Sequence, residues 1–237
     1  MISTSARRIN SLLELMPKPA RYLEIGVETG QTFFEVSAAY KTAVDPLFCF
    51  DLKATRLDDS LQYHEVTSDT FFNQINGDQK YDLVFIDGLH TWDQTYRDFC
   101  NSLLATHDRS IIILDDIFPC DVFSCNRDQT EAAMMRSLMT GDPSNAWHGD
   151  TYKMIPLIQE FHSTLSFCTV ITGGNPQAIV WRSINSDKCE KPTRFFSDPS
   201  SLNLPALDYI WFLQNQQSYN LTSEEDAIDL LSNVLSN

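Results

Sequence analysis

Short apolar runs that end in acidic residues constrain the fold of this 237-residue chain more than any other feature. Asp82 to Ile86 is followed by Asp87-Gly-Leu-His90, and Ser110 to Leu114 is followed by Asp115-Asp116. Runs of this length and apolarity are typical of strands buried on both faces, as in a parallel sheet covered by helices. Because such sheets bind ligands at the carboxyl ends of their strands, we expect the acids and the histidine to gather at one rim.

Strand and helix patterns alternate along most of the chain. The predicted strands are residues 21–25, 42–44, 63–66, 82–86 and 110–114, and then a closing hairpin of 165–171 and 178–181. The predicted helices are one within residues 1–16, a short one after residues 67–69, and residues 32–40, 91–103, 128–140 and 150–162. This order predicts an α/β fold: a mostly parallel sheet of seven strands with an antiparallel last strand and helices on both faces.

The end of the chain differs from the rest in composition. Residues 184–205 are polar and contain prolines, which predicts irregular structure, whereas residues 207–213 and 223–235 have the apolar spacing of two further helices. We therefore expect a domain over residues 1–183, with its N-terminal helix, and a C-terminal helical extension over residues 184–237. This extension packs on the same domain or on a partner, in which case it would mediate a homo-oligomer.

Charge and cysteine content exclude several classes of partner. The 32 acidic and 17 basic residues give a formal net charge of −15, which repels nucleic-acid phosphates and leaves a small molecule as the expected partner. The six cysteines form no C-x-x-C pair, which favours reduced thiols in a cytoplasmic protein. No apolar stretch approaches the roughly 18 residues of a membrane span, so we expect no membrane partner.

Two glycines lie in the turn after the first strand. The segment Glu24-Ile-Gly26-Val-Glu-Thr-Gly30 lets the backbone pass close to a ligand at the start of a helix. It is not the G-x-G-x-x-G turn of nicotinamide-dependent enzymes, because Glu28 stands at a glycine position and would face the pyrophosphate. Asp45 ends the second strand, where a carboxylate can accept both hydroxyls of a ribose.

Further motifs follow the later strands. They are Ser68-Asp-x-Phe-Phe, Asp87-Gly-Leu-His90 and Trp147-His-Gly-Asp150-x-x-Lys153. Together with the glycine turn, the acid after strand two and the closing hairpin, they resemble class I S-adenosylmethionine (SAM)-dependent methyltransferases. More narrowly, they are similar to a family of small bacterial methyltransferases, family 24. The resemblance covers about residues 21–183 and implies a Rossmann-like methyltransferase fold.

The resemblance implies a SAM site at the ends of the first four strands. The residues that would line the methionine part of the cofactor are Glu24, Gly26, Val27 and Gly30, with Thr32 near its carboxylate. The residues that would hold the ribose and lie near the adenine are Asp45, Ser68 and Asp69, and Asp87 would also contact the cofactor. Many family members have His-Asp where this chain has Asp115-Asp116, so this pair is a departure that adds a carboxylate.

Asp87, Asp115 and Asp116 form a candidate metal site, because they end two neighbouring strands of such a sheet. Carboxylate oxygens suit a hard ion such as Mg²⁺, which orients hydroxyls and lowers their pKa. Metal-dependent O-methyltransferases of the catechol type and of macrolide sugars have a similar set of acids. His90, three residues after Asp87, is a candidate general base. Alternatively, His90 is a capping or structural residue, or contacts a metal or the cofactor. The alternative for the three acids is that Asp87 contacts the cofactor while Asp115 and Asp116 cap the following loop.

Capping residues are predicted for two helices. Thr91 can cap the helix that it begins, and Gln94, three positions later, can complete a capping box with it. Asp150 can cap the helix over 150–162. His148 either belongs to this surface cap or faces the substrate, since loops at such a rim carry function.

The sequence thus predicts an enzyme that moves a methyl group from SAM to a hydroxyl of a small polyhydroxylated or sugar-like acceptor, assisted by Mg²⁺ and with His90 as base. Two alternatives remain: metal-independent methyl transfer, and a SAM-binding protein without catalysis. The loops over residues 47–62, 117–128 and 141–150 contain no motif that identifies the acceptor.

Overall fold

One eight-stranded sheet forms the centre of the molecule. The computed structural model describes residues 2–52, 60–75, 79–183 and 202–236. The strand order is β3-β2-β1-β4-β5-β7-β6-β8. The strands are β1 (Arg21–Ile25), β2 (Tyr40–Asp45), β3 (Leu61–Glu65), β4 (Tyr81–Ile86), β5 (Thr106–Leu114), β6 (Leu165–Val170), β7 (Gln177–Arg182) and β8 (Leu221–Thr222). The first five strands are mutually parallel, and β7 is antiparallel to both β5 and β6, which confirms the predicted α/β fold. The sheet has one strand more than the seven predicted, because β8 of the C-terminal segment pairs with β6.

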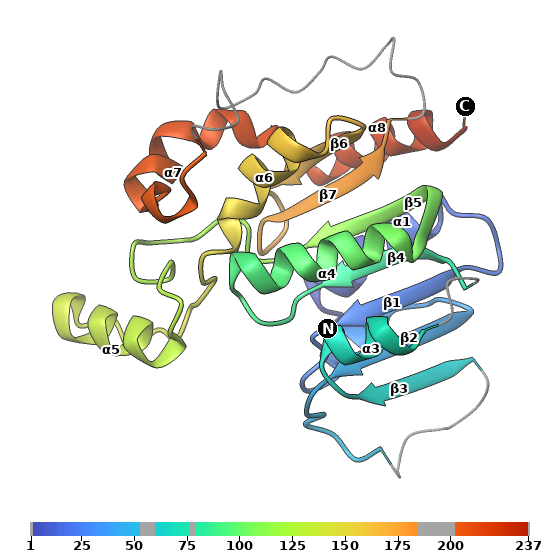
Figure 1. Ribbon diagram of the computed structural model, residues 1–237, viewed down its shortest axis with the longest axis horizontal. Helices are drawn as coiled ribbons and strands as arrows, with labels where there is room; N and C mark the ends of the chain where they lie inside the picture. Colours follow the sequence, from blue (N-terminus) through green and yellow to red (C-terminus); the bar gives the residue numbers. More distant parts are fainter. Residues whose placement is uncertain (1, 53–59, 76–78, 184–201, 237) are drawn as a thin grey trace.

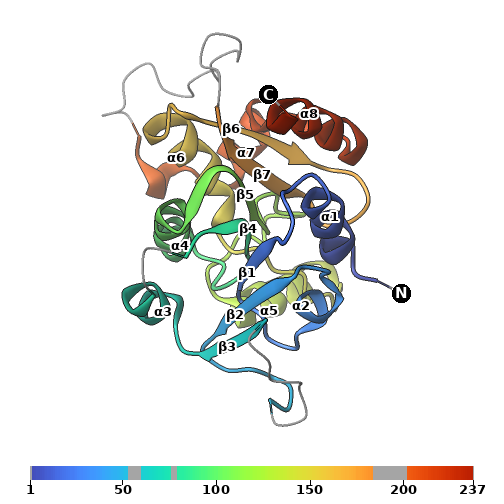
Figure 2. The same ribbon diagram turned by 90° about the vertical axis from the view of Figure 1, so that its right-hand side faces the viewer.

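Helices cover both faces of the sheet (Figure 1 and Figure 2). On one face lie α1 (Thr4–Leu13), α2 (Gln31–Glu35) and α8 (Glu224–Ser236). On the other lie α3 (Ser68–Gln74), α4 (Trp92–Leu104), α6 (Met154–Phe161) and α7 (Tyr209–Asn215). Helix α5 (Gln129–Thr140) extends beyond the carboxyl ends of the strands (Figure 1). The short 3-10 helices are Thr151–Lys153, Leu204–Ala206 and Gln216–Tyr219.

Side chains along the central strands alternate between two apolar cores. In β4, Leu83 and Phe85 belong to the core under α1 and α8, whereas Val84 and Ile86 belong to the core under α4 and α6. Each of these side chains is at most 2% exposed. Burial on both faces explains why the run is apolar throughout and not alternately polar.

Helix α2 is shorter than the predicted helix over residues 32–40, because it ends at Glu35. Val36 adopts an extended conformation, and the buried ammonium group of Lys41 donates hydrogen bonds to the carbonyls of Phe33 and Val36. A side chain of β2 therefore satisfies the carbonyls at the end of this helix, which local propensity does not reveal.

The predicted caps of α4 and of the following helical segment are wrong. Thr91 is the N-cap residue of α4, but its side chain makes no capping hydrogen bond. Instead the amide of Trp92 donates to Asp150 Oδ1 at 2.9 Å, and Asp150 does not cap its own helix. Gln94 turns toward Ser68 and Asp98. A long-range cap satisfies an N-terminal amide of α4 and holds the 141–150 loop at the rim.

The C-terminal segment lies against the same sheet. Strand β8 pairs with β6 in parallel, and Phe212 of α7 and Leu231 of α8 are fully buried in the two cores. Residues 184–201, expected to be irregular, lie outside the described residues. Within the described ranges, no helix has the length and apolarity needed to cross a membrane.

Candidate active site

The central strands end at one level, which gathers the polar residues that follow them. Ile25 of β1 pairs with Ile86 of β4, and Ile86 pairs with Leu114 of β5. Gly26, Asp87 and Asp115 are the next residues of these strands, so the register alone brings them to one rim. The sequence therefore places its polar strand ends correctly.

The glycine turn is packed directly against the end of β4. Gly26 has a φ of +84°, and a Cβ atom there would lie 2.0 Å from the carbonyl oxygen of Asp87. Gly30 has a φ of +78°, and a Cβ there would meet the ring of Phe34 at 2.3 Å. Glu28 also has a left-handed backbone, with a φ of 46°, so it takes the conformation of the glycine that it replaces. Both glycines are required by the backbone of the turn itself.

Asp45 holds this turn in place. Its Oδ2 accepts hydrogen bonds from the amides of Val27 at 2.7 Å and Glu28 at 2.9 Å, and its Oδ1 accepts one from the amide of Leu47 at 2.8 Å. A carboxylate has about four acceptor positions, so one lone pair remains for a ligand. Asp45, the predicted ribose residue, therefore also shapes the turn, which lines a cavity at this rim.

A cavity of about 500 Å³ opens between the turn, β4 and α4. The predicted site residues that line it are Gly26, Asp45, Ser68, Asp69, Asp87 and His90. The predicted residues outside its lining are Glu24, Val27, Gly30, Thr32, Asp115 and Asp116. Val27 and Gly30 are buried residues of the turn, and Thr32 is a half-buried residue of α2. The volume is within the range of small-molecule sites.

Glu24 lies beneath the cavity, 1% exposed, and its Oε2 accepts a hydrogen bond from the hydroxyl of Tyr22 at 2.6 Å. Burial raises the pKa of Glu24 to about 8, although this hydrogen bond lowers it. Glu24 is thus mostly protonated at neutral pH in the absence of a ligand.

His90 lies between two carboxylates at the mouth of the cavity. Its Nδ1 is 2.9 Å from Asp116 Oδ2, without the alignment of a hydrogen bond, and its Nε2 is 3.5 Å from Asp87 Oδ1. The ring stacks on Trp147, with centroids 4.6 Å apart. Burial favours the neutral imidazole, but Asp116 and Asp87 outweigh it and raise the pKa of His90 to about 10. The side chain is therefore an imidazolium at neutral pH, not the free base that its ordinary pKa predicts.

The pKa values of the two carboxyl groups beside His90 shift in opposite directions. Burial raises the pKa of Asp87 to about 6, although its contact with His90 lowers it. Burial also acts to raise the pKa of Asp116, but the imidazole of His90 holds it below its usual value. Asp116 has a left-handed backbone, with a φ of 57°, which is uncommon outside glycine. The three side chains thus form one coupled acid-base centre.

Asp115 points away from this centre, although it is adjacent to Asp116. Its Oδ2 accepts a hydrogen bond from Gln177 Nε2 at 3.1 Å, and its Oδ1 accepts one from Asn175. Among the described residues, the group of side chains whose ligand atoms lie within 4.8 Å of one another consists of Asp87, His90 and Asp116. The structure thus places His90, and not Asp115, with the other two acids of the predicted metal site. The two carboxylates share the Nδ2 group of Asn175, but of the two only Asp116 also contacts His90.

Several residues of the site carry no strong sequence signal. The two on α4 are Gln94 and Asp98, which line the cavity, and Gln94 Nε2 donates to Ser68 Oγ at 3.1 Å. The two in loops are Trp147, beneath His90, and Asn175, whose Nδ2 donates to Asp116 Oδ1 at 3.0 Å. His148 is buried with its Nε2 3.9 Å from Asp116 Oδ1, so it belongs to the site and not to a surface cap. Only the Trp147-His-Gly-Asp150 motif indicated any of them.

Known proteins resemble this chain in part of its sequence and in its fold. Residues 23–117 match the model of methyltransferase family 24, which describes a methyltransferase domain. A search of curated proteins gives no match. A solved structure from Corynebacterium glutamicum aligns with a TM-score of 0.51 and 11% identity, over 77% of this chain and 81% of that chain. At this identity the alignment shows the fold.

Two solved O-methyltransferases align slightly less well. The Bacillus cereus enzyme, in complex with S-adenosylhomocysteine (SAH), has a TM-score of 0.49 and 15% identity, over 77% of this chain and 82% of its own. TomG from Streptomyces achromogenes, involved in tomaymycin synthesis and in complex with SAM, has a TM-score of 0.48 and 11% identity, over 77% of this chain and 81% of its own. The match to the methyltransferase domain model thus covers the glycine turn, Asp45, Asp87 and Asp116, and the solved structure from Corynebacterium glutamicum shows the same fold.

Proposed function

We propose that this protein transfers a methyl group from SAM to a hydroxyl of a small polyhydroxylated or sugar-like acceptor. One observation carries the proposal: the rim that forms the cofactor cavity also holds His90 between Asp87 and Asp116. A cavity that suits the cofactor and a candidate acid-base centre share one wall, as methyl transfer to a hydroxyl requires.

The charge of the cavity favours SAM over a dinucleotide. Its lining includes the carboxyl groups of Glu28, Asp45, Asp69, Asp87 and Asp98. Such a lining attracts the sulfonium and ammonium groups of SAM and repels a pyrophosphate. We assign the methionine part to the glycine turn, the ribose to the free lone pair of Asp45, and the adenine to the end near Ser68 and Asp69.

His90 is the proposed general base, and Asp87 and Asp116 orient its ring. Its Nε2 faces Asp87 at the cavity, while Asp116 holds Nδ1 on the opposite side. Trp147 covers one face of the ring and limits its rotation. For His90 to accept a proton from a hydroxyl, its own proton must first leave the site, because the two carboxylates stabilise the imidazolium.

The residues present fit a divalent cation at this centre. Asp87, His90 and Asp116 offer their ligand atoms within 4.8 Å, and the buried Nδ1 of His90 has no aligned hydrogen-bond partner. Asp87 and Asp116 would hold the ion, with Mg²⁺ as the expected species. A bound ion would replace the charge of the imidazolium between the carboxylates, lower the pKa of His90 and orient two acceptor oxygens.

Calorimetry tests the cofactor assignment directly. We expect SAH to bind the protein and NAD⁺ to show no measurable binding, because the acidic lining attracts the ammonium group of SAH and repels the pyrophosphate of NAD⁺. Equal affinity for both ligands, or binding of neither, would contradict the proposal.

Metal binding is tested with Mn²⁺ as a spectroscopic probe, in the presence of SAH. We expect Mn²⁺ to bind, to be displaced by Mg²⁺, and to lose at least tenfold in affinity in Asp116→Asn, because that variant removes a carboxylate charge from the centre. Asp69→Asn is the matched control at the far end of the same cavity, and its Mn²⁺ affinity should stay within about twofold of wild type. Electron paramagnetic resonance measures the free ion. An unchanged affinity in Asp116→Asn would rule out this metal site.

A further inference from the structure

Arg8 of α1 is an arginine buried beneath the surface of the domain, 1% exposed. Every part of its guanidinium group is engaged. Nε donates to Glu224 Oε2 of α8 at 3.1 Å, Nη2 donates to the carbonyl of Thr172 at 2.9 Å, and Nη1 donates to the carbonyl of Asn175 at 3.2 Å and to the side chain of Gln177. Arg8 therefore joins both ends of the chain to the β6–β7 hairpin.

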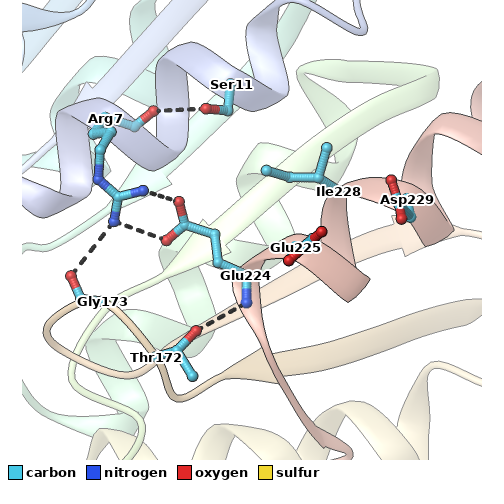
Figure 3. Close-up of a pocket in the computed structure, with 8 residues that line it drawn as sticks. All are labelled: Arg7, Ser11, Thr172, Gly173, Glu224, Glu225, Ile228 and Asp229. Carbon is cyan, nitrogen blue, oxygen red and sulfur yellow. Dashed lines mark hydrogen bonds and ion pairs between the residues drawn. The ribbon is translucent and has the colours of Figure 1, made fainter.

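The surface end of this arrangement is visible in Figure 3. Arg7, the exposed neighbour of Arg8, pairs with the same carboxylate of Glu224 and reaches the carbonyl of Gly173. The amide of Glu224 donates to Thr172 Oγ1 at 2.9 Å, which fixes the start of α8 on the hairpin. Arg7 and Arg8 thus share the carboxylate of Glu224, but of the two only Arg8 also contacts the buried side chain of Gln177.

Gln177 connects Arg8 to the candidate active site. Its side chain is fully buried, and its Oε1 accepts a hydrogen bond from Arg8. An amide that presents its oxygen to a guanidinium must present its NH₂ group on the other side. Gln177 Nε2 accordingly donates to Asp115 Oδ2 at 3.1 Å and to Ser5 Oγ at 2.9 Å.

Asn175 provides a second connection through the hairpin loop. Arg8 holds its backbone carbonyl, while its side-chain Nδ2 donates to Asp115 and, at 3.0 Å, to Asp116 Oδ1. The other oxygen of Asp116 is the one 2.9 Å from His90 Nδ1. A continuous series of polar contacts therefore runs from Glu224 through Arg8, Asn175 and Asp116 to the imidazole of His90.

We propose that Arg8 is a positioning residue of the active site, which sets the orientation of Gln177 and Asn175 and through them holds Asp115 and Asp116 in place beside His90. Glu224 anchors Arg8, so the C-terminal helix is part of this arrangement and not only a cover for the sheet. The role of Arg8 in catalysis rests on the proposed function, whereas its effect on His90 is a structural property that needs no ligand.

The test uses the full-length protein labelled with nitrogen-15 in histidine, at one neutral pH. Arg8→Met removes all donors, and we expect the His90 ring nitrogen resonances to move by several parts per million because Asp116 is released. Arg8→Lys, which keeps the charge without the fork of donors, should restore the wild-type signals only in part. Glu224→Gln acts from the surface end, and we expect a smaller shift of the same direction.

Arg7→Met is the matched control, because Arg7 shares Glu224 with Arg8 but touches neither Gln177 nor Asn175. Its His90 signals should equal those of wild type, and SAH affinity should remain within twofold in all four variants. Unchanged His90 signals in Glu224→Gln and Arg8→Lys would overturn the proposal even if Arg8→Met failed to fold, as would an equal shift in Arg7→Met. Absence of SAH binding by the wild type would count against the proposed function alone.

Discussion

Gly26→Ala is expected to destabilise the protein by about 3 kcal/mol or more and to abolish SAH binding. A methyl group at this position would lie 2.0 Å from the carbonyl oxygen of Asp87 and 2.5 Å from the Cα of Gly88. Both obstacles are backbone atoms at the end of β4, so neither can rotate away. Relief requires the glycine turn to separate from β4, which removes one wall of the cofactor cavity. Urea unfolding and SAH calorimetry measure the two effects.

Gly141→Ala separates this steric effect from backbone strain. Gly141 follows α5 with a φ of +76°, similar to that of Gly26, but a Cβ there would meet no atom within 4 Å. It should therefore cost only about 1 kcal/mol, the price of a left-handed conformation for alanine. Gly26→Ala and Gly141→Ala variants of equal stability would refute the close approach of the turn to β4.

His90→Ala is expected to lower kcat for methyl transfer by 10²- to 10⁴-fold, the usual contribution of a general base. SAH affinity should change by less than about threefold, because Asp45 and the glycine turn remain intact. The assay follows SAH release with an acceptor selected from catechols, sugars and related polyols. A loss in kcat without a loss of SAH binding would also exclude the alternative of a SAM-binding protein without catalysis.

His107→Ala is the control for removal of a paired histidine. His107 Nε2 lies 2.9 Å from Asp82 Oδ1, a contact as close as that of His90 with Asp116, but at the amino end of β4 and β5. We expect this variant to lower kcat by no more than about twofold, because His107 lies at the opposite end of the strands from His90. Equal losses in the two variants would show that only stability was being measured.

Local patterns in the sequence predicted most of the fold. Apolar runs indicated the central strands β4 and β5, because a strand buried on both faces has little room for polar side chains. The same reasoning failed where a distant residue decides a local structure. Lys41 ends α2 early, and Asp150, which lies 58 positions after Trp92, supplies the cap of α4.

The candidate site shows the same division. The glycines, Asp45 and Asp87 follow directly from strand ends, and the register of β1, β4 and β5 brings them together. The partners of His90 do not follow in this way. Asp116 turns toward His90 while Asp115 turns to Gln177 and Asn175, which lie about 60 positions further along the chain.

The sequence by itself determined the α/β sheet, the turn at the end of its first strand and the acids at its rim, since these depend on burial and on residues adjacent in the chain. Only the tertiary structure decided which acid faces the histidine and in which protonation state. The pKa of His90 depends on two carboxylates and on burial, and therefore on distances between loops that no local pattern encodes. The inward path from Glu224 to Arg8 and Gln177 joins segments about 170 to 220 positions apart, which meet only in the folded protein.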